Sequence, residues 1–208
     1  MNVVKASQGG QPIQVTEEDL ALINQMTRRE LKAEEVYTFS VRLCDNEVDR
    51  DWERFSTETL EELAGMFVGK SGIFDHQWSA KGQAARIYKT EIVYEPEKTT
   101  KAGDAYCWMK GYAYMVPTEQ NRNLIAEIEG GIKKEVSVGC AVKRAVCSLC
   151  GMDQHEGGCG HQKGQVYDGQ LWLRYITWEE LEEKFPTWQQ LEDASLRWEL
   201  LETYVSWS

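Results

Sequence analysis

The sequence predicts an α+β fold. We expect a core of mainly antiparallel strands, arranged as a barrel or sheet, with peripheral helices, a loop stapled by cysteine and histidine residues, and a helical C-terminal tail. Hydrophobic residues make up 42% of the 208 residues and aromatic residues 11%, which suits a globular interior. The predicted elements follow the order helix, strand, helix, strands, helix, strand. This irregular order argues against a parallel, doubly wound sheet.

The first part of the chain predicts two helices and one strand. Thr16 caps a helix that runs to about Leu31, with acidic residues in its first turn, where the helix dipole favours negative charge. Residues 36–44 alternate apolar and polar side chains, as expected of a strand with one buried face. A second helix opens at Ser56 or Thr57. Four apolar residues form a stripe along it: Leu60, Leu63, Ala64 and Phe67.

The following part predicts three more strands and one helix. Residues 84–94 and 105–116 read as strands joined by a polar loop, and the second strand is rich in Tyr and Trp. A helix then begins at Pro117 and ends at Gly130. It leads directly into residues 135–140, which alternate apolar and small side chains and therefore predict a strand.

The chain divides into a body and two flanking segments. Residues 1–15 are polar and rich in Gly and Gln, which predicts a disordered lead. The body spans residues 16–171 and carries an insertion at 146–164. Residues 172–208 predict a helical tail, in which capping boxes open short units with Trp and Leu on one face. Such a tail either lies over the body or binds a partner. Tryptophan recurs in it at a spacing of ten: Trp178, Trp188 and Trp198.

Charge and hydropathy exclude several classes of partner. The net charge of -11 argues against unaided binding to nucleic acid or to an anionic membrane, because the chain has no basic stripe. No apolar run approaches the roughly 20 residues of a membrane span. The first 14 residues lack the pattern of a secretory signal, so we expect a reducing cytosol. In that compartment six cysteines favour free thiols or a metal site over disulfides.

A short cysteine-rich segment predicts a metal site. Cys147 and Cys150 form a Cys-x2-Cys pair, and Cys159 and His161 form a Cys-x-His pair. Thiolates and imidazoles at this spacing favour four-coordinate Zn²⁺, with His155 as an alternate ligand. Four protein ligands leave no open position for water, so the zinc would be structural. The alternative is a mobile loop with incidental thiols.

The strand at residues 135–140 also carries a candidate nucleophile. Val136 and Val138 point towards the predicted core, whereas Ser137 and Gly139 form a face of small groups that could be the floor of a substrate groove. A serine needs a base within hydrogen-bond reach. Two of the three histidines lie in the cysteine segment, which leaves His76. The alternative is a hydrogen-bonded strand serine and an unrelated loop histidine.

Several motifs occur in a fixed order along the chain. They are the strand 36–44 with the acidic loop 45–55, Ile73-Phe74-Asp75-His76, the helix containing Asn123-Leu124-Ile125 before Gly131-Ile132, and Ser137-Val138-Gly139. Together, residues 36–169 resemble the prohead proteases of tailed phages, which are serine enzymes of capsid maturation related in fold to the herpesvirus assemblins. The cysteine segment resembles a zinc insertion found in a subgroup of these proteins.

The resemblance implies a serine endopeptidase that processes phage scaffold and capsid proteins during virion assembly. It implies Ser137 as the nucleophile and His76 as the general base, on a barrel of mainly antiparallel strands. It also implies capsid and scaffold proteins as partners, inside the assembling prohead in the host cytoplasm. No nucleic-acid or membrane partner is expected, and a homo-oligomer is left open.

The family pattern stops after Leu171. The strand that would complete the barrel and supply the third catalytic residue is missing. Asp168 is the nearest downstream acid and therefore the candidate for that third position. The alternative function is a catalytically silent, protease-like scaffold or a zinc-stabilised protein-binding module in capsid assembly.

Overall fold

The computed structural model describes residues 2–8, 11–74, 82–141, 144–153, 159–167, 170–171, 174–177 and 204–207. In chain order the elements are β1 (Asn2–Gln8), β2 (Gln11–Ile13), α1 (Glu17–Asn24), the 3₁₀ turn η1 (Ala33–Glu35), β3 (Tyr37–Asp45), β4 (Glu53–Phe55), α2 (Thr57–Phe67), β5 (Ser71–Phe74), β6 (Ala85–Thr99), β7 (Ala105–Met115), α3 (Arg122–Glu129), β8 (Glu135–Ala141), β9 (Arg144–Cys147), β10 (Val166–Tyr167), β11 (Gln170–Leu171), β12 (Arg174–Thr177) and β13 (Tyr204–Trp207).

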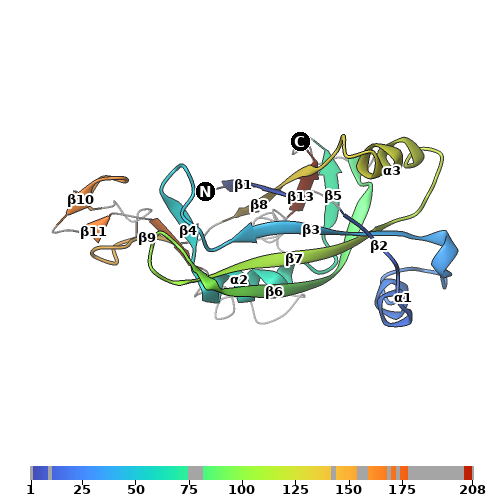
Figure 1. Ribbon diagram of the computed structural model, residues 1–208, viewed down its shortest axis with the longest axis horizontal. Coiled ribbons are helices and arrows are strands. Elements are labelled where there is room, and N and C mark those ends of the chain that lie inside the picture. The colour runs from blue at the N-terminus through green and yellow to red at the C-terminus, as the bar shows by residue number, and fades with distance from the viewer. Residues whose placement is uncertain are drawn as a thin grey trace, which may run out of the picture.

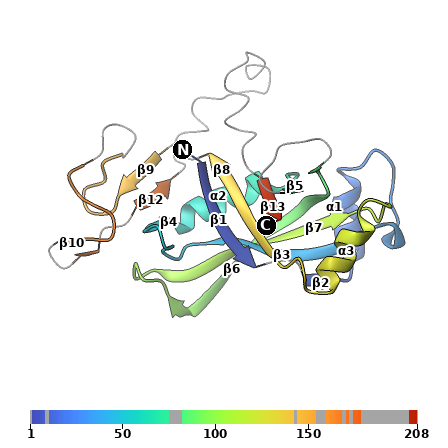
Figure 2. The same cartoon turned by 90° about the horizontal axis from the view of Figure 1, so that it is seen from above.

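The main sheet has eight strands in the order β1-β8-β13-β5-β6-β7-β3-β2. Neighbouring strands are antiparallel except for β13 and β5, which are parallel. The predicted α+β class with a mainly antiparallel core is therefore confirmed, as an open sheet rather than a closed barrel. The sheet folds over itself, so that β1 and β8 cross β3 (Figures 1 and 2).

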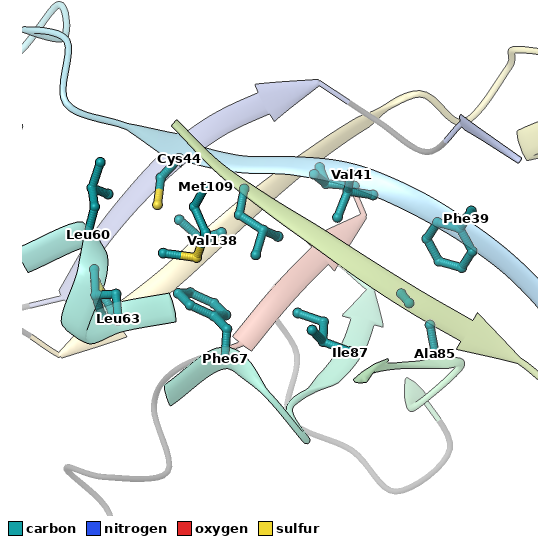
Figure 3. Close-up of a cluster of buried hydrophobic side chains, with 14 of the residues drawn as sticks. Phe39, Val41, Cys44, Leu60, Leu63, Phe67, Ala85, Ile87, Met109 and Val138 are labelled. Carbon is teal, nitrogen blue, oxygen red and sulfur yellow. The ribbon is translucent and has the colours of Figure 1, made fainter. Parts of the chain in front are cut away.

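The main core fills the space between the two halves of this folded sheet and α2. The apolar stripe predicted for α2 is buried there, with Leu60, Leu63 and Phe67 packed against side chains of β3, β6 and β7 (Figure 3). From the other half, β8 contributes Val136 and Val138 to the same cluster. A smaller cluster joins α1 to the outer face of the sheet through Ile23, Leu31, Tyr88 and Tyr114.

Two predictions about the chain ends are wrong for the residues that the structure describes. The polar lead is not disordered, because β1 pairs along its whole length with β8, from Asn2 opposite Ala141 to Gln8 opposite Glu135. The tail is not helical where it is described, because both of its described parts, β12 and β13, are strands. In each case pairing with a distant strand overrides the local composition. The three tryptophans Trp178, Trp188 and Trp198 lie outside the described residues.

A second, smaller sheet lies beside the main one and has the order β4-β12-β9. In it β12 is parallel to β4 and antiparallel to β9. The strand β9 ends at Cys147, so this sheet carries the start of the cysteine segment. Within the described residues, no helix is long and apolar enough to cross a membrane.

Candidate functional site

Ser137 lies in the middle of β8 with a paired strand on each side. Its register partners are Ala6 of β1 and Ser206 of β13. The predicted alternation holds: Val136 and Val138 pack into the main core, and Ser137 lies between them in the strand. Only 5% of Ser137 is exposed to solvent. The small-residue row was expected to form the floor of a groove, but here it is flanked by paired backbone on both sides.

The strand that precedes His76 belongs to the same sheet. Ile73 of β5 is in register with Ser206 of β13, which is in register with Ser137 of β8. Only one strand therefore separates the serine strand from the strand that runs towards His76. His76 itself, like Asp168 and His155, lies outside the described residues. The roles assigned to these residues remain predictions.

The structure brings together the four residues predicted as metal ligands. The ligand atoms of Cys147, Cys150, Cys159 and His161 all lie within 4.8 Å of one another. The Cys147 Sγ and His161 Nδ1 atoms are 3.6 Å apart. A tetrahedral zinc ion with Zn–S and Zn–N bonds of about 2.3 and 2.0–2.1 Å would place these two atoms about 3.6 Å apart. This Cys3His cluster can bind a metal ion.

Backbone turns position the first two thiols. The Gly151 N–H donates to the Cys147 carbonyl at 2.9 Å, and the Cys147 N–H donates to the Met152 carbonyl at 3.0 Å. Gly151 has a φ of 70°, a left-handed conformation that favours glycine. The reversal returns the chain to β9, where Asp153 bridges to Val146. Cys147 is thus fixed at a strand end while Cys150 is exposed.

The second half of the cluster is held by an aromatic side chain. The Tyr167 ring stands edge-on to the His161 ring, with 4.8 Å between their centroids. The Tyr167 hydroxyl accepts a hydrogen bond from the Gln162 N–H at 3.0 Å. The ring contact with Tyr167 restricts the orientation of the His161 side chain. The three cysteines outside the cluster, Cys44, Cys107 and Cys140, are buried in the body. Burial raises the pKa of the Cys107 thiol.

The cysteine segment docks on Trp52 and on Glu53, the first residue of β4. Lys163 Nζ lies 2.8 Å from Glu53 Oε1, in an ion pair whose two side chains are largely withdrawn from water. Beside it, Gly164 packs so closely on Trp52 that a Cβ there would lie 2.7 Å from the indole nitrogen. Gly164 has a φ of 77°. A metal bound to the cluster would therefore fix a segment that is already attached to the body.

Two buried polar residues of this region were missed in the sequence. Asn46 is fully buried, and its side-chain amide donates to the Ala105 carbonyl at 2.8 Å and to Thr57 Oγ1 at 3.2 Å. Its side-chain oxygen accepts from the Cys107 N–H at 3.0 Å. Arg54 is also buried and forms an ion pair with Asp104. Both belong to the acidic loop expected at residues 45–55, and no local signal there marks a polar residue as buried.

The comparisons with known proteins found one distant structural likeness. No family model and no curated protein matches the sequence. A solved structure of the bacteriophage T4 capsid assembly protease gp21 is similar, with 12% sequence identity and a TM-score of 0.41. The matched region covers 73% of this chain and 87% of that one. At this distance the likeness assigns no role to any residue of the chain.

Proposed function

We propose that this protein is a serine endopeptidase that processes phage scaffold and capsid proteins during prohead maturation. The ordered motifs of residues 36–169 support the assignment. The observation that carries it is the sheet order: β5, which runs towards His76, and β8, which carries Ser137, are separated only by β13. Had these strands lain on opposite sides of the core, the two residues could not share a site.

The proposed reaction is acyl transfer. The Ser137 hydroxyl attacks the scissile carbonyl while His76 takes its proton, and His76 then returns the proton to the leaving amine. Asp168 is the proposed third residue, which would orient the imidazole. The substrates would be capsid and scaffold proteins within the assembling prohead in the host cytoplasm. The net charge of -11 suits contact with basic segments of such partners.

The Cys3His cluster would hold a structural Zn²⁺ ion. The donor set of three thiolates and one imidazole is typical of closed, tetrahedral zinc sites, and the 3.6 Å separation of Cys147 Sγ and His161 Nδ1 fits that geometry. Zinc would stabilise the segment that contacts Trp52 and Glu53. It has no role in the chemical step, because all four positions are filled by protein.

Labelling with a fluorophosphonate serine probe, with the adduct located by mass spectrometry, tests the nucleophile. We expect an adduct on Ser137 in the purified, zinc-loaded protein and none in Ser137→Ala or His76→Ala. Ser40→Ala is a matched control, because Ser40 is also a buried strand serine, with 9% exposure. Its adduct level should equal that of the unsubstituted protein. If Ser137 is labelled neither in the purified protein nor in assembled proheads, the protease assignment is wrong.

One observation favours the second candidate, a catalytically silent scaffold or protein-binding module. Ser137 is 5% exposed and has paired strands on both sides, so a substrate carbonyl has no open path to it in this arrangement. The two candidates make opposite predictions for the probe. A silent module gives no adduct, whether the protein is isolated or in the prohead.

Metal analysis tests the zinc site. We expect one zinc ion per chain, and roughly 100-fold weaker binding in Cys150→Ser, because one of four ligands accounts for about 3 of the 10–16 kcal/mol typical of such sites. Cys150 is exposed, so this substitution leaves no cavity in the core. Cys44→Ala is the control, because Cys44 is buried outside the cluster. Equal zinc affinity in both variants would contradict the assignment.

A further inference from the structure

The most unusual strand in the main sheet is β13. It is four residues long, yet it is paired on both edges in the interior of an eight-stranded sheet. Tyr204 to Trp207 pair with Gly139 to Val136 of β8, and Val205 to Trp207 pair with Gly72 to Phe74 of β5. The preceding described strand, β12, ends at Thr177 and belongs to the other sheet. A segment that is distant in the sequence thus joins the two halves of the main sheet, between β8 and β5.

The strands on both sides of β13 have other supports. From β8, Val136, Val138 and Cys140 are buried in the core cluster with side chains of α2, β3, β6 and β7. All seven residues of β8 also pair with β1. On the other side, β5 pairs with β6, and the Ala84 N–H donates to the Gly72 carbonyl at 3.0 Å. The two strands that flank β13 are therefore held in place by contacts that do not involve β13.

Its location is the one that a substrate backbone would need. Ser206 of β13 is directly opposite Ser137, the proposed nucleophile, and is also opposite Ile73 on the strand that leads to His76. Residues directly opposite each other in an antiparallel pair have Cβ atoms about 4.5–5.5 Å apart. An extended peptide in this position would carry its backbone past the serine while pairing with strands on both sides.

We infer that the space between β8 and β5 is a peptide-binding slot, occupied here by the chain's own residues 204–207, which an extended segment of the substrate must displace. This inference rests on the proposed peptidase function. The occupant runs antiparallel to β8 and parallel to β5. It is uncharged, with a small residue opposite Ser137 and large residues at the positions of Tyr204 and Trp207. Substrate segments of the same kind are the expected ligands.

The tethered strand competes with any added peptide. A segment that belongs to the same chain as its binding site commonly competes at an effective concentration on the order of millimolar. If the chain's own strand has the same micromolar affinity as the free peptide, the peptide would bind the full chain roughly a thousandfold more weakly than it binds a chain that lacks the strand. The difference is a measurable signature of shared occupancy.

Fluorescence anisotropy with a labelled peptide of residues 203–208, Thr-Tyr-Val-Ser-Trp-Ser, tests the slot. The protein carries Ser137→Ala, so that binding is measured without cleavage. We expect a chain that ends at Thr203 to bind the peptide at least tenfold more tightly than the full chain does. The shortened chain should not bind a peptide of the same residues in scrambled order. Equal affinities, or no binding by the folded shortened chain, would overturn the inference.

A measurement on the intact protein covers the case in which the shortened chain does not fold. Hydrogen exchange of the full chain should show the β13 amides exchanging much faster than those of β7, because a displaceable strand opens locally. Equal protection of β13 and β7 would refute the slot. The peptide and probe experiments can be told apart. Peptide binding with no probe adduct on Ser137, either in the isolated protein or in assembled proheads, supports the slot and rejects the peptidase. A probe adduct on Ser137 without peptide binding supports the nucleophile and rejects the slot.

Discussion

Replacing the buried Asn46 with aspartate should destabilise the protein strongly and in a pH-dependent way. The two side chains have nearly the same shape, so the change affects hydrogen bonding and charge rather than packing. The Asn46 amide donates to the Ala105 carbonyl at 2.8 Å and to Thr57 Oγ1 at 3.2 Å. A carboxylate can donate to neither. It would instead place a negative oxygen against the carbonyl oxygen of Ala105.

The magnitude follows from these contacts. The lost bond to Ala105 contributes about 1 kcal/mol, and the buried carbonyl left without a donor costs a further 1–3 kcal/mol or so. The Thr57 hydroxyl can donate to the carboxylate, but burying the new charge adds at least about 1 kcal/mol. Asn46→Asp should therefore lower the free energy of unfolding by about 3–5 kcal/mol near neutral pH. For a domain of this size, each kcal/mol shifts the melting temperature by roughly 2–4 °C. The melting temperature should fall by roughly 6–20 °C.

The pH dependence supplies a sharper test. Burial disfavours the charged form, so the pKa of the introduced carboxyl is raised in the folded protein above its unfolded value of about 3.9. The destabilisation is then complete at pH values above the raised folded pKa, and it shrinks as the pH falls through that pKa. The protonated acid can donate one hydrogen bond to Ala105, which restores part of the native arrangement.

Urea unfolding followed by tryptophan fluorescence between pH 4 and 8 measures both effects. Asn121→Asp is the matched control, because the Asn121 amide also donates to a backbone carbonyl, that of Val116, at 3.0 Å, but in an exposed contact. We expect it to cost no more than about 1 kcal/mol. If Asn46→Asp costs no more than this control, or if its cost does not change with pH, Asn46 is not the buried anchor that the structure indicates.

Three further predictions concern packing and capping. Gly164→Ala combines a left-handed backbone with a contact on Trp52, so it should cost about 2 kcal/mol in urea unfolding, and an unchanged midpoint would contradict that contact. Gly111→Ala would place a Cβ 2.9 Å from Leu43 Cδ1 in the main core, so thermal unfolding should reveal a loss of about 1–3 kcal/mol, whereas a stabilised variant would show spare room there. Thr16 accepts the Asp19 N–H at 3.1 Å at the start of α1, so Thr16→Ala should reduce the free energy of unfolding by about 1 kcal/mol, and Thr16→Ser should restore most of it.

The central elements could be predicted from the sequence because their signals are local. Alternating side chains marked β3 and β8, Tyr and Trp content marked β7, and the apolar stripe at helical spacing marked α2. The four candidate metal ligands were also identified in this way, since a Cys-x2-Cys turn and a nearby Cys-x-His pair are close in space wherever the chain reverses. Residue type and spacing are enough for such features.

The partners of the two terminal segments were decided only by the tertiary structure. The polar lead becomes β1 because β8 offers an edge along its whole length, and Tyr204 to Trp207 become β13 because β8 and β5 leave a space between them. The same holds for Asn46, whose partners are as distant in the sequence as Ala105 and Cys107. Strand pairing and buried hydrogen bonds join residues that are far apart along the chain, so their free energy depends on the assembled fold and leaves little trace in the local sequence.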